Sequence, residues 1–402
     1  MKPWLTLREG GGSYWAIRAT VAVLVLAVVL YIPMRAEAGT ISTAVEALVL
    51  MGAAMALNLV LGYTGQISIG HSAFLGIGAY VTGIFVSRWG WSPWVTLPVA
   101  FVIAFLIGVV VSFPASRIKG VYLALVTLAL GLVFPQILLW PKLTWLTGGG
   151  PGLPNDESQV PSTGFNIGRR EGQMQFFKIF GWDPFGDLRR PDAKEAFFYW
   201  IALVFTVIVY LVCRGIVKSR VGRSLVAIRD NETAAAVMGV NLVRTKAFVF
   251  GISAGLCALP GCLTAMRSGT ISPEGIVSLT VRAAITFLIV MVIGGAGSLW
   301  GPIVGAVAYT WIIDKTGGWA EESAIPAPLR PLFGWADIPP ADGIFALLLI
   351  LLMFVAPRGL VGAWKQYSPR IVRVIPRPAG AIGATPAVVP ATVTTTPATA
   401  ES

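Results

Sequence analysis

The sequence predicts an all-α polytopic membrane protein with about ten transmembrane helices, and three observations support that prediction. First, 55% of the 402 residues are hydrophobic and 12% are charged, whereas soluble proteins carry about a quarter charged residues. Second, apolar runs of about twenty residues recur along the chain, and that length crosses a hydrocarbon core of about 30 Å. Third, tryptophan and tyrosine lie at the ends of these runs, where amphipathic rings favour the membrane interface.

Ten hydrophobic runs are long enough to be spans. Aromatic residues mark many of their ends, namely Trp15, Tyr31, Trp89, Trp91, Trp94, Trp140 and Trp364. The expected spans cover residues 15–33, 41–61, 67–87, 94–113, 121–140, 196–214, 246–266, 276–293, 299–314 and 341–357.

Lysine and arginine in the short connections predict the orientation, because basic residues stay on the cytoplasmic side. The loop at 215–245, between the sixth and seventh spans, is rich in them and is expected to be cytoplasmic. Counting from it places both chain ends inside (N-in and C-in) and the 141–195 loop outside. The expected organisation is a cytoplasmic N-terminus (1–14), a transmembrane domain (15–357) and a cytoplasmic, largely disordered tail (358–402).

The N-terminus also resembles a cleavable signal peptide. A basic start precedes an apolar run from Ala19 to Ile32, and the sequence AEAG follows at 36–39. Cleavage at Ala38 leaves nine spans and an external N-terminus. The alternative keeps the first span as an anchor; because it already satisfies the charge rule, it is the one adopted here.

Composition argues against several other classes of protein. Cys213, Cys257 and Cys262 lie in or beside apolar runs, so we expect them to pack rather than to form disulfides or bind a metal. His71 is the only histidine and has no evident acidic partner, which leaves no catalytic site and no expected cofactor. The net charge of +11 is concentrated in flanks and loops, which indicates membrane topology and not a nucleic-acid-binding surface.

The stretch GYTGQISIGHSAF (62–74) places glycines and polar side chains between two apolar runs. Such backbone persists at membrane depth only where protein or a water-filled cavity surrounds it. Small residues also permit close helix packing, which is the favoured explanation for the glycines from Gly70 onward. His71 is expected to be a hydrogen-bonded structural residue rather than a proton carrier. A weak internal sequence similarity aligns Gly65, Gly70 and Tyr80 with Gly297, Gly301 and Tyr309.

Residues 219–241 form the most informative hydrophilic stretch. Apolar residues recur at helical spacing, Ser219 is suited to cap the start, and Gly239 fits a left-handed stop. A single short amphipathic helix is therefore expected on the cytoplasmic side. It either lies on the lipid surface or is presented to the groove of a soluble partner. The sequence contains no phosphate-binding loop motif, so ATP hydrolysis by that chemistry requires another subunit.

Four segments occur in a recognisable order: LNLVLGYTGQISIGHSAFLGIGAYVTG (57–83), GVYLALVTLALG (120–131) with TGGGPGLP (147–154), VGRSLVAIRDNETAAAVMGVNLVRTKAFVFGISAGLCALPGCLTA (221–265) and VIGGAGSLWGPIVGA (292–306). Together they resemble LivM-type permeases, the membrane subunits of branched-chain amino-acid ABC importers. The hydrophilic segment at 158–195 and the tail lie outside the family pattern. ETAAAVMG (232–239) matches the general signature of ABC importers only in part.

The resemblance implies a permease subunit of an ATP-driven importer for branched-chain or related amino acids, in a plasma membrane of bacterial type. The implied partners are a LivH-type permease, two cytoplasmic ABC ATPases, an external substrate-binding protein and the lipid membrane. The resemblance also implies that 219–241 docks into an ATPase. The coupling candidates are Arg223, Arg229, Asp230, Glu232 and Gly239.

Glycine-interrupted spans are a pointer to transport sites, so 62–71 and 294–301 are candidates for the translocation path or its gate. Arg282 is the clearest charged residue within a span; it either snorkels to the outer surface or binds a substrate carboxylate. The candidate path residues are Tyr63, Thr64, Gln66, Ser68, His71, Ser298 and Arg282.

Alternatives exist for the cargo and for the energy source. Urea, amides and small carboxylates are the alternative cargoes, because an external receptor selects the solute. An ion-coupled secondary transporter is the main rival, but such proteins place acidic residues or histidine relays inside the membrane. The spans here are nearly free of carboxylates, with Glu46 and Asp314 near outer ends. A structural scaffold would not explain polar, glycine-interrupted spans.

Overall fold

The computed structural model describes residues 5–8, 19–20, 23, 27, 29–33, 37–66, 68–117, 121–153, 191–317, 350, 354 and 359–375. The chain divides into two compact units. The larger unit is Ala27–Gln366, and the smaller unit combines Met1–Leu26 with Tyr367–Ser402. All the site residues discussed below belong to the larger unit.

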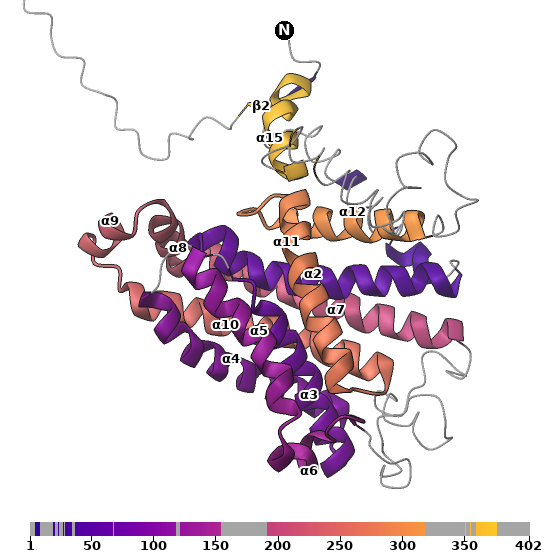
Figure 1. Ribbon diagram of the computed structural model, residues 1–402. Coiled ribbons are helices and arrows are strands. Elements are labelled where there is room, and N and C mark those ends of the chain that lie inside the picture. Colours follow the sequence, from indigo (N-terminus) through magenta and orange to yellow (C-terminus); the bar gives the residue numbers. More distant parts are fainter. Residues whose placement is uncertain are drawn as a thin grey trace, which may run out of the picture. The chain divides into compact units, whose positions relative to one another are not determined.

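Eight helices of the larger unit occupy the positions of the second to ninth predicted spans (Figure 1). Apolar runs of this length form helices because a helix satisfies its own backbone hydrogen bonds where water is absent. The helices are α2 (Ala38–Thr64), α3 (His71–Trp89), α4 (Pro93–Arg117), α5 (Val121–Leu138), α7 (Pro191–Lys218), α10 (Leu242–Ser268), α11 (Pro273–Gly294) and α12 (Trp300–Gly317).

Four of these helices, α2, α4, α7 and α10, contain a stretch long and apolar enough to cross a membrane. Among the described residues, one further candidate span combines most of α5 with the short helices η1 (Pro141–Leu143) and α6 (Thr144–Thr147), bent by 62°. These helices support an integral membrane protein. The total of ten spans and the N-in, C-in orientation stay predictions.

Several predicted features fall outside the described residues. They are most of the N-terminal segment with its first span and signal-like sequence, the greater part of the 141–195 loop, nearly all of the tenth span, and the tail after residue 375. Helix α7 begins at Pro191, ahead of the predicted start of the sixth span at residue 196.

The smaller unit contains one pair of short strands. Strands β1 (Leu5–Arg8) and β2 (Val372–Ile375) pair in parallel, with Leu5 opposite Val372. Valine and isoleucine in β2 favour extended backbone because they are β-branched. Helix α15 (Gly359–Ile371) precedes β2, so helix and strand occupy the first part of the segment predicted as a tail.

Helix α10 is the centre of the larger unit and packs against α2, α3 and α4 (Figure 1). Its approach to α3 depends on glycine. A Cβ added at Gly78 would overlap the carbonyl oxygen of Ala258, and one added at Gly261 would overlap that of Leu75. Gly70 meets the backbone of α5 in the same way. The predicted packing role of Gly70 and Gly78 is therefore confirmed, since small residues let helix backbones approach closely.

The three cysteines are buried in helix contacts. The Sγ atoms of Cys257 and Cys262, both on α10, lie 3.3 Å from carbonyl oxygens of α3. The Sγ of Cys213 on α7 lies 3.8 Å from the carbonyl oxygen of Met55 on α2. All three act as small packing residues, as predicted.

Residues 148–153 of the TGGGPGLP motif form a tight turn after α6. Gly148, Gly149 and Gly152 have positive φ angles, a region that glycine enters without steric cost. Leu153 then pairs with Ile271 through two backbone hydrogen bonds of 2.6 and 2.7 Å. The motif thus ties the end of α6 to the connection between α10 and α11.

Several helices expose large apolar side chains. On α4, Val102, Leu106 and Val110 follow one another at four-residue spacing and are each more than half exposed. On α7, Val204 and Leu211 are exposed to a similar degree. Stripes of this kind are unfavourable in water, whereas they suit lipid or a second membrane subunit.

Replacing Gly261 with alanine is expected to force α3 and α10 apart, because the added Cβ would overlap backbone that no side-chain rotation can move. Overpacking of this kind costs about 1–3 kcal/mol. We therefore expect a lower melting temperature of the purified protein in a thermal-shift measurement.

Gly215→Ala on α7 is the matched control. A Cβ at Gly215 has no heavy atom within 4 Å, and alanine favours a helix over glycine by about 1 kcal/mol. A Gly261→Ala protein that melts together with this control would contradict the packing assigned to Gly261.

Candidate translocation path and coupling site

Two glycine turns interrupt the helices at the same end of the larger unit. Helix α2 ends at Thr64, and Gly65 follows with φ 72°. Helix α11 ends at Gly294, and Gly297 has φ 78° before α12 begins. The sequence similarity predicted around Gly65 and Gly297 therefore extends to their backbone conformation, because both residues occupy the left-handed region.

Asn58 joins the two turns. Its buried amide donates from Nδ2 to the carbonyl oxygen of Ser298 at 2.8 Å, while its Oδ1 accepts from the backbone N–H of Gly297 at 3.0 Å. A Cβ added at Gly62 would overlap both Asn58 Oδ1 and the Gly297 nitrogen. Glycine at position 62 is therefore needed for this contact. An amide buried among apolar helices is stable only when such partners exist.

Arg229 reaches the same place from the hydrophilic segment. Its Nη1 donates to the carbonyl oxygen of Gly62 at 3.1 Å, where the end of α2 carries partial negative charge. Gly65 lies against the side-chain carbons of Arg229, and Gly297 lies against its guanidinium. The Nε and Nη2 atoms also contact Asp230 Oδ1 at 3.2 and 3.3 Å. One arginine side chain thus contacts both glycine turns.

The hydrophilic segment forms two helices rather than the single one predicted. They are α8 (Arg220–Asp230) and α9 (Glu232–Val237). The break occurs because Asn231 is extended, with φ −160°, and its side chain accepts from the N–H of Ala234 to cap α9. The predicted cap at Ser219 and the left-handed Gly239 are both confirmed.

The predicted coupling residues differ in what they contact. Arg223 and Asp230 are exposed on α8, and Gly239 follows α9 in an exposed turn with φ 86°. Glu232 instead forms a 2.7 Å ion pair with the buried Lys246 of α10, which fastens α9 to the central helix. Arg229 is bound to α2, as described above.

His71 lies in a chain of buried hydrogen bonds. Ser253 Oγ donates to the carbonyl oxygen of Ala56, so it must accept from His71 Nε2 at 2.7 Å. His71 Nδ1 then accepts from Ser68 Oγ at 2.8 Å. This order requires a neutral imidazole with its proton on Nε2. The chain links α2, α3 and α10, which agrees with the structural role expected of His71.

The other path candidates differ in their burial and in their hydrogen bonds. Thr64 Oγ1 bonds to the carbonyl oxygen of Val60 within its own helix, and Tyr63 is buried. Ser298 contributes its carbonyl oxygen to Asn58. The Gln66 side chain is partly exposed and makes no hydrogen bond with any described residue. Gln66 is therefore a path candidate whose polar group stays available.

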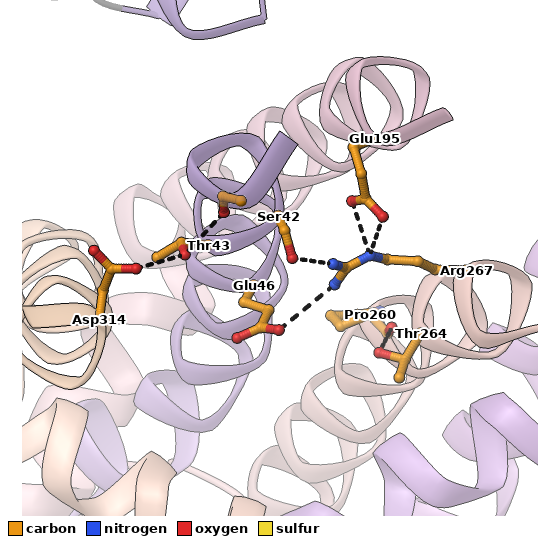
Figure 2. A network of polar contacts seen from close by, with 9 residues as sticks. Ser42, Thr43, Glu46, Glu195, Pro260, Thr264, Arg267 and Asp314 are labelled. Atoms are coloured by element: carbon orange, nitrogen blue, oxygen red, sulfur yellow. Dashed lines mark hydrogen bonds and ion pairs between the residues drawn. The ribbon is translucent and has the colours of Figure 1, made fainter. Parts of the chain in front are cut away.

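Arg282 lies apart from these residues, in a cavity of about 530 Å³ lined by parts of α2, α7, α10, α11 and α12. This cavity adjoins the last turn of α10, whereas α9 adjoins its first turn. Arg267 organises one wall: it contacts Glu195 Oε2 at 3.1 Å, Ser42 Oγ at 2.6 Å and Glu46 Oε1 at 3.7 Å (Figure 2). The structure therefore places Arg282 and the coupling candidate Glu232 at opposite ends of α10.

Sequence reasoning missed several of these residues. Asn58 and Ser253 are polar residues within long apolar runs, and that isolation was the available signal, because a polar side chain there needs a partner. Arg267 and Glu195 lie at helix ends, where charged residues are ordinary, so their ion pair required the tertiary structure.

Comparison with known proteins gives a consistent result. The family model described as branched-chain amino acid transport system / permease component matches residues 39–356. The high-affinity branched-chain amino acid transport system permease protein LivM of Escherichia coli K12 is 34% identical over 292 residues. That of Salmonella typhimurium LT2 is 32% identical over 291 residues.

The coverage of these relatives is partial. Each LivM match includes 71% of this chain and 65% of the relative, so the chain spans less than two thirds of their length. The probable branched-chain amino acid transport permease protein LivH of Methanocaldococcus jannaschii is 24% identical over 327 residues, which is 78% of this chain and 89% of that protein. No solved structure matches the chain.

Replacing Ser253 with alanine tests the buried hydrogen-bond chain. The substitution leaves the Nε2–H of His71 without its acceptor, and an unsatisfied buried donor costs about 1–3 kcal/mol. We expect a lower melting temperature in a thermal-shift measurement. Ser224→Ala on α8, which removes only a solvent-exposed bond to Arg220, should melt like the parent protein. Equal melting of both variants would contradict a stabilising hydrogen bond between His71 and Ser253.

Proposed function

The chain belongs to the family of branched-chain amino acid transport system permease components, and from that premise we propose that it is a membrane subunit of an ATP-driven importer. Its cargo is a branched-chain or related amino acid, delivered by an external binding protein. It pairs with a LivH-type permease and with two cytoplasmic ATPases. The observation that carries the proposal is the contact of Arg229 with both glycine turns.

Helices α8 and α9 form the surface that meets an ATPase in this proposal. The segment from residue 214 to residue 246 is rich in lysine and arginine, which favours the cytoplasmic side. Val237 and Met238, at the end of α9, are 82% and 83% exposed. Two large apolar side chains projecting together from a polar segment are suited to a groove of a soluble partner.

The attachment of α9 to α10 supports a mechanical role for α9 in coupling. The Glu232–Lys246 pair joins α9 to the first turns of α10, and Lys246 is only 3% exposed. A buried ion pair of this kind resists separation, because removing one partner leaves an uncompensated charge. Movement of a bound ATPase is therefore transmitted to α10 rather than absorbed by a loose loop.

Arg229 provides the second connection. When α8 moves, the guanidinium moves the end of α2 through the carbonyl oxygen of Gly62. It also acts on the turn before α12, which Asn58 ties to α2. Both glycine-interrupted stretches then change together, and ATP binding shifts the population of inward- and outward-facing states.

The docking surface is tested by replacing Val237 and Met238 with aspartate together. Because the apolar contacts are lost and two charges enter the groove, we expect the ATPase to be absent when the membrane complex is purified. Thr233→Asp, an exposed position on α9, adds charge without removing an apolar contact and should retain the ATPase. Co-purification of an ATPase with the double variant at the parental level would exclude this surface.

The coupling role of Arg229 is tested by Arg229→Gln in reconstituted vesicles. A charge-assisted hydrogen bond contributes about 1.5–3 kcal/mol, so we expect amino-acid uptake per ATP hydrolysed to fall about ten-fold or more. The ATPase should remain bound, because Arg229 faces α2. Arg220→Gln, which removes an exposed charge from the same helix, is the control. Loss of ATPase binding in Arg229→Gln would instead assign the residue to the docking surface.

A further inference from the structure

The cavity around Arg282 has the dimensions of a small-molecule site. Its volume is about 530 Å³, and binding pockets range over about 300–1,000 Å³. It lies at the end of α10 away from α9, and a 27-residue helix such as α10 is about 40 Å long. The cavity is therefore distinct from the cluster of Asn58, Arg229 and the two glycine turns.

One arginine of the cavity is already engaged. Arg267 directs its guanidinium between α7 and α2, where Glu195 and Ser42 receive its strongest contacts (Figure 2). Three side chains around one cation hold it in a fixed position. Arg267 and Glu195 thus form a wall of the cavity and are not available to a ligand.

Arg282 and Glu46 are the available charges. Arg282 is exposed and makes no hydrogen bond or ion pair with any residue in the described part of the chain. The Glu46 side chain is 66% exposed, and its ion pair is the long 3.7 Å contact with Arg267. Both side chains line the same cavity. It therefore offers one free guanidinium and one weakly engaged carboxylate.

The remaining surface is largely apolar. Branched and aromatic side chains dominate the lining, with hydroxyl groups of Thr286 and Tyr309 bonded to each other at 3.2 Å. The apolar residues include Val49, Leu50, Leu75, Phe198, Leu263 and Phe287. Burying a branched hydrocarbon side chain against such a surface contributes binding free energy without directional bonds.

We propose that this cavity binds an α-amino acid as its zwitterion, with the carboxylate at Arg282, the ammonium at Glu46 and the hydrocarbon side chain against the apolar wall. The assignment rests on the proposed function and specifies where its cargo enters the membrane subunit. Arginine is suited to a carboxylate because its planar fork donates two parallel hydrogen bonds.

The charge balance separates this ligand from the alternative cargoes. The four charged residues among the described lining are Glu46, Glu195, Arg267 and Arg282, so the formal charges cancel. A zwitterion keeps this balance and satisfies both available groups. Urea carries no charge for Arg282. A simple carboxylate leaves Glu46 with only its long 3.7 Å contact to Arg267, which is a weak compensation when a ligand closes the cavity to water.

The test uses the complete complex in detergent, without the binding protein, and measures binding of tritiated leucine. We expect Arg282→Gln to weaken binding at least ten-fold and Arg282→Lys, which keeps the cation, to weaken it less. In the parent complex 4-methylpentanoate, which lacks the ammonium group, should compete at least ten-fold less well than unlabelled leucine. In Glu46→Gln that discrimination should disappear.

Lys315→Gln and Asp314→Asn are the matched controls. Each removes a charge near the end of α12, and neither residue lines the cavity. Wild-type-like leucine binding by both Arg282 variants and by Glu46→Gln, at equal amounts of folded complex, would overturn the assignment. Equal loss in Arg282→Gln and Arg282→Lys would overturn recognition through charge.

Uptake into vesicles with the binding protein present separates this inference from the proposed function. A parent complex that imports leucine with ATP, but whose uptake is unchanged by Arg282→Gln and Glu46→Gln, refutes the cavity and leaves the importer intact. A parent complex that imports no amino acid under ATP refutes the proposed function and the cavity with it.

Discussion

The arrangement of α8, the end of α2 and the turn before α12 depends on the contacts of the Arg229 side chain. The guanidinium binds the carbonyl oxygen of Gly62 and lies against Gly297, while the side-chain carbons lie against Gly65. One side chain thus joins α8 to two turns far apart in the sequence. This close packing requires glycine at position 62, because a Cβ there would overlap the Asn58 amide and the Gly297 nitrogen. Glycine at positions 62 and 297 is therefore explained by the close approach of the two turns, the Asn58 amide and the Arg229 guanidinium.

Two long helices connect this cluster with the cavity at the other end. Helix α2 carries Glu46 and Asn58, and α10 carries Lys246 and Arg267. Hydrogen bonds through His71 and Ser253 hold α2, α3 and α10 together between the two ends. Helices tied in this way move as rigid elements, which is the mechanical condition for coupling events at one end to a site at the other.

Most of the polar groups inside the helices have partners, and this changes how the polar stretch is understood. Thr64, Ser68 and His71 all bond within the protein, so their presence is explained by packing and hydrogen-bond satisfaction. Gln66 and Arg282 differ, because neither side chain is bonded to a described residue. In the described part of the chain, the polar residues with unused hydrogen-bonding capacity are the better candidates for contact with a solute.

The sequence by itself determined the membrane class, the positions of eight helices, the Ser219 cap and the left-handed Gly239, because these depend on apolar run length and on local backbone chemistry. It also indicated the family through ordered motifs, which the match over residues 39–356 bears out. The tertiary structure alone decided that Arg229 contacts α2, that Asn58 joins two turns, and that Arg282 and Glu46 share a cavity with Arg267. Hydrophobic periodicity predicts which residues enter the membrane. The partner of a buried polar group instead depends on how helices pack, which brings together residues up to about 240 positions apart in the sequence.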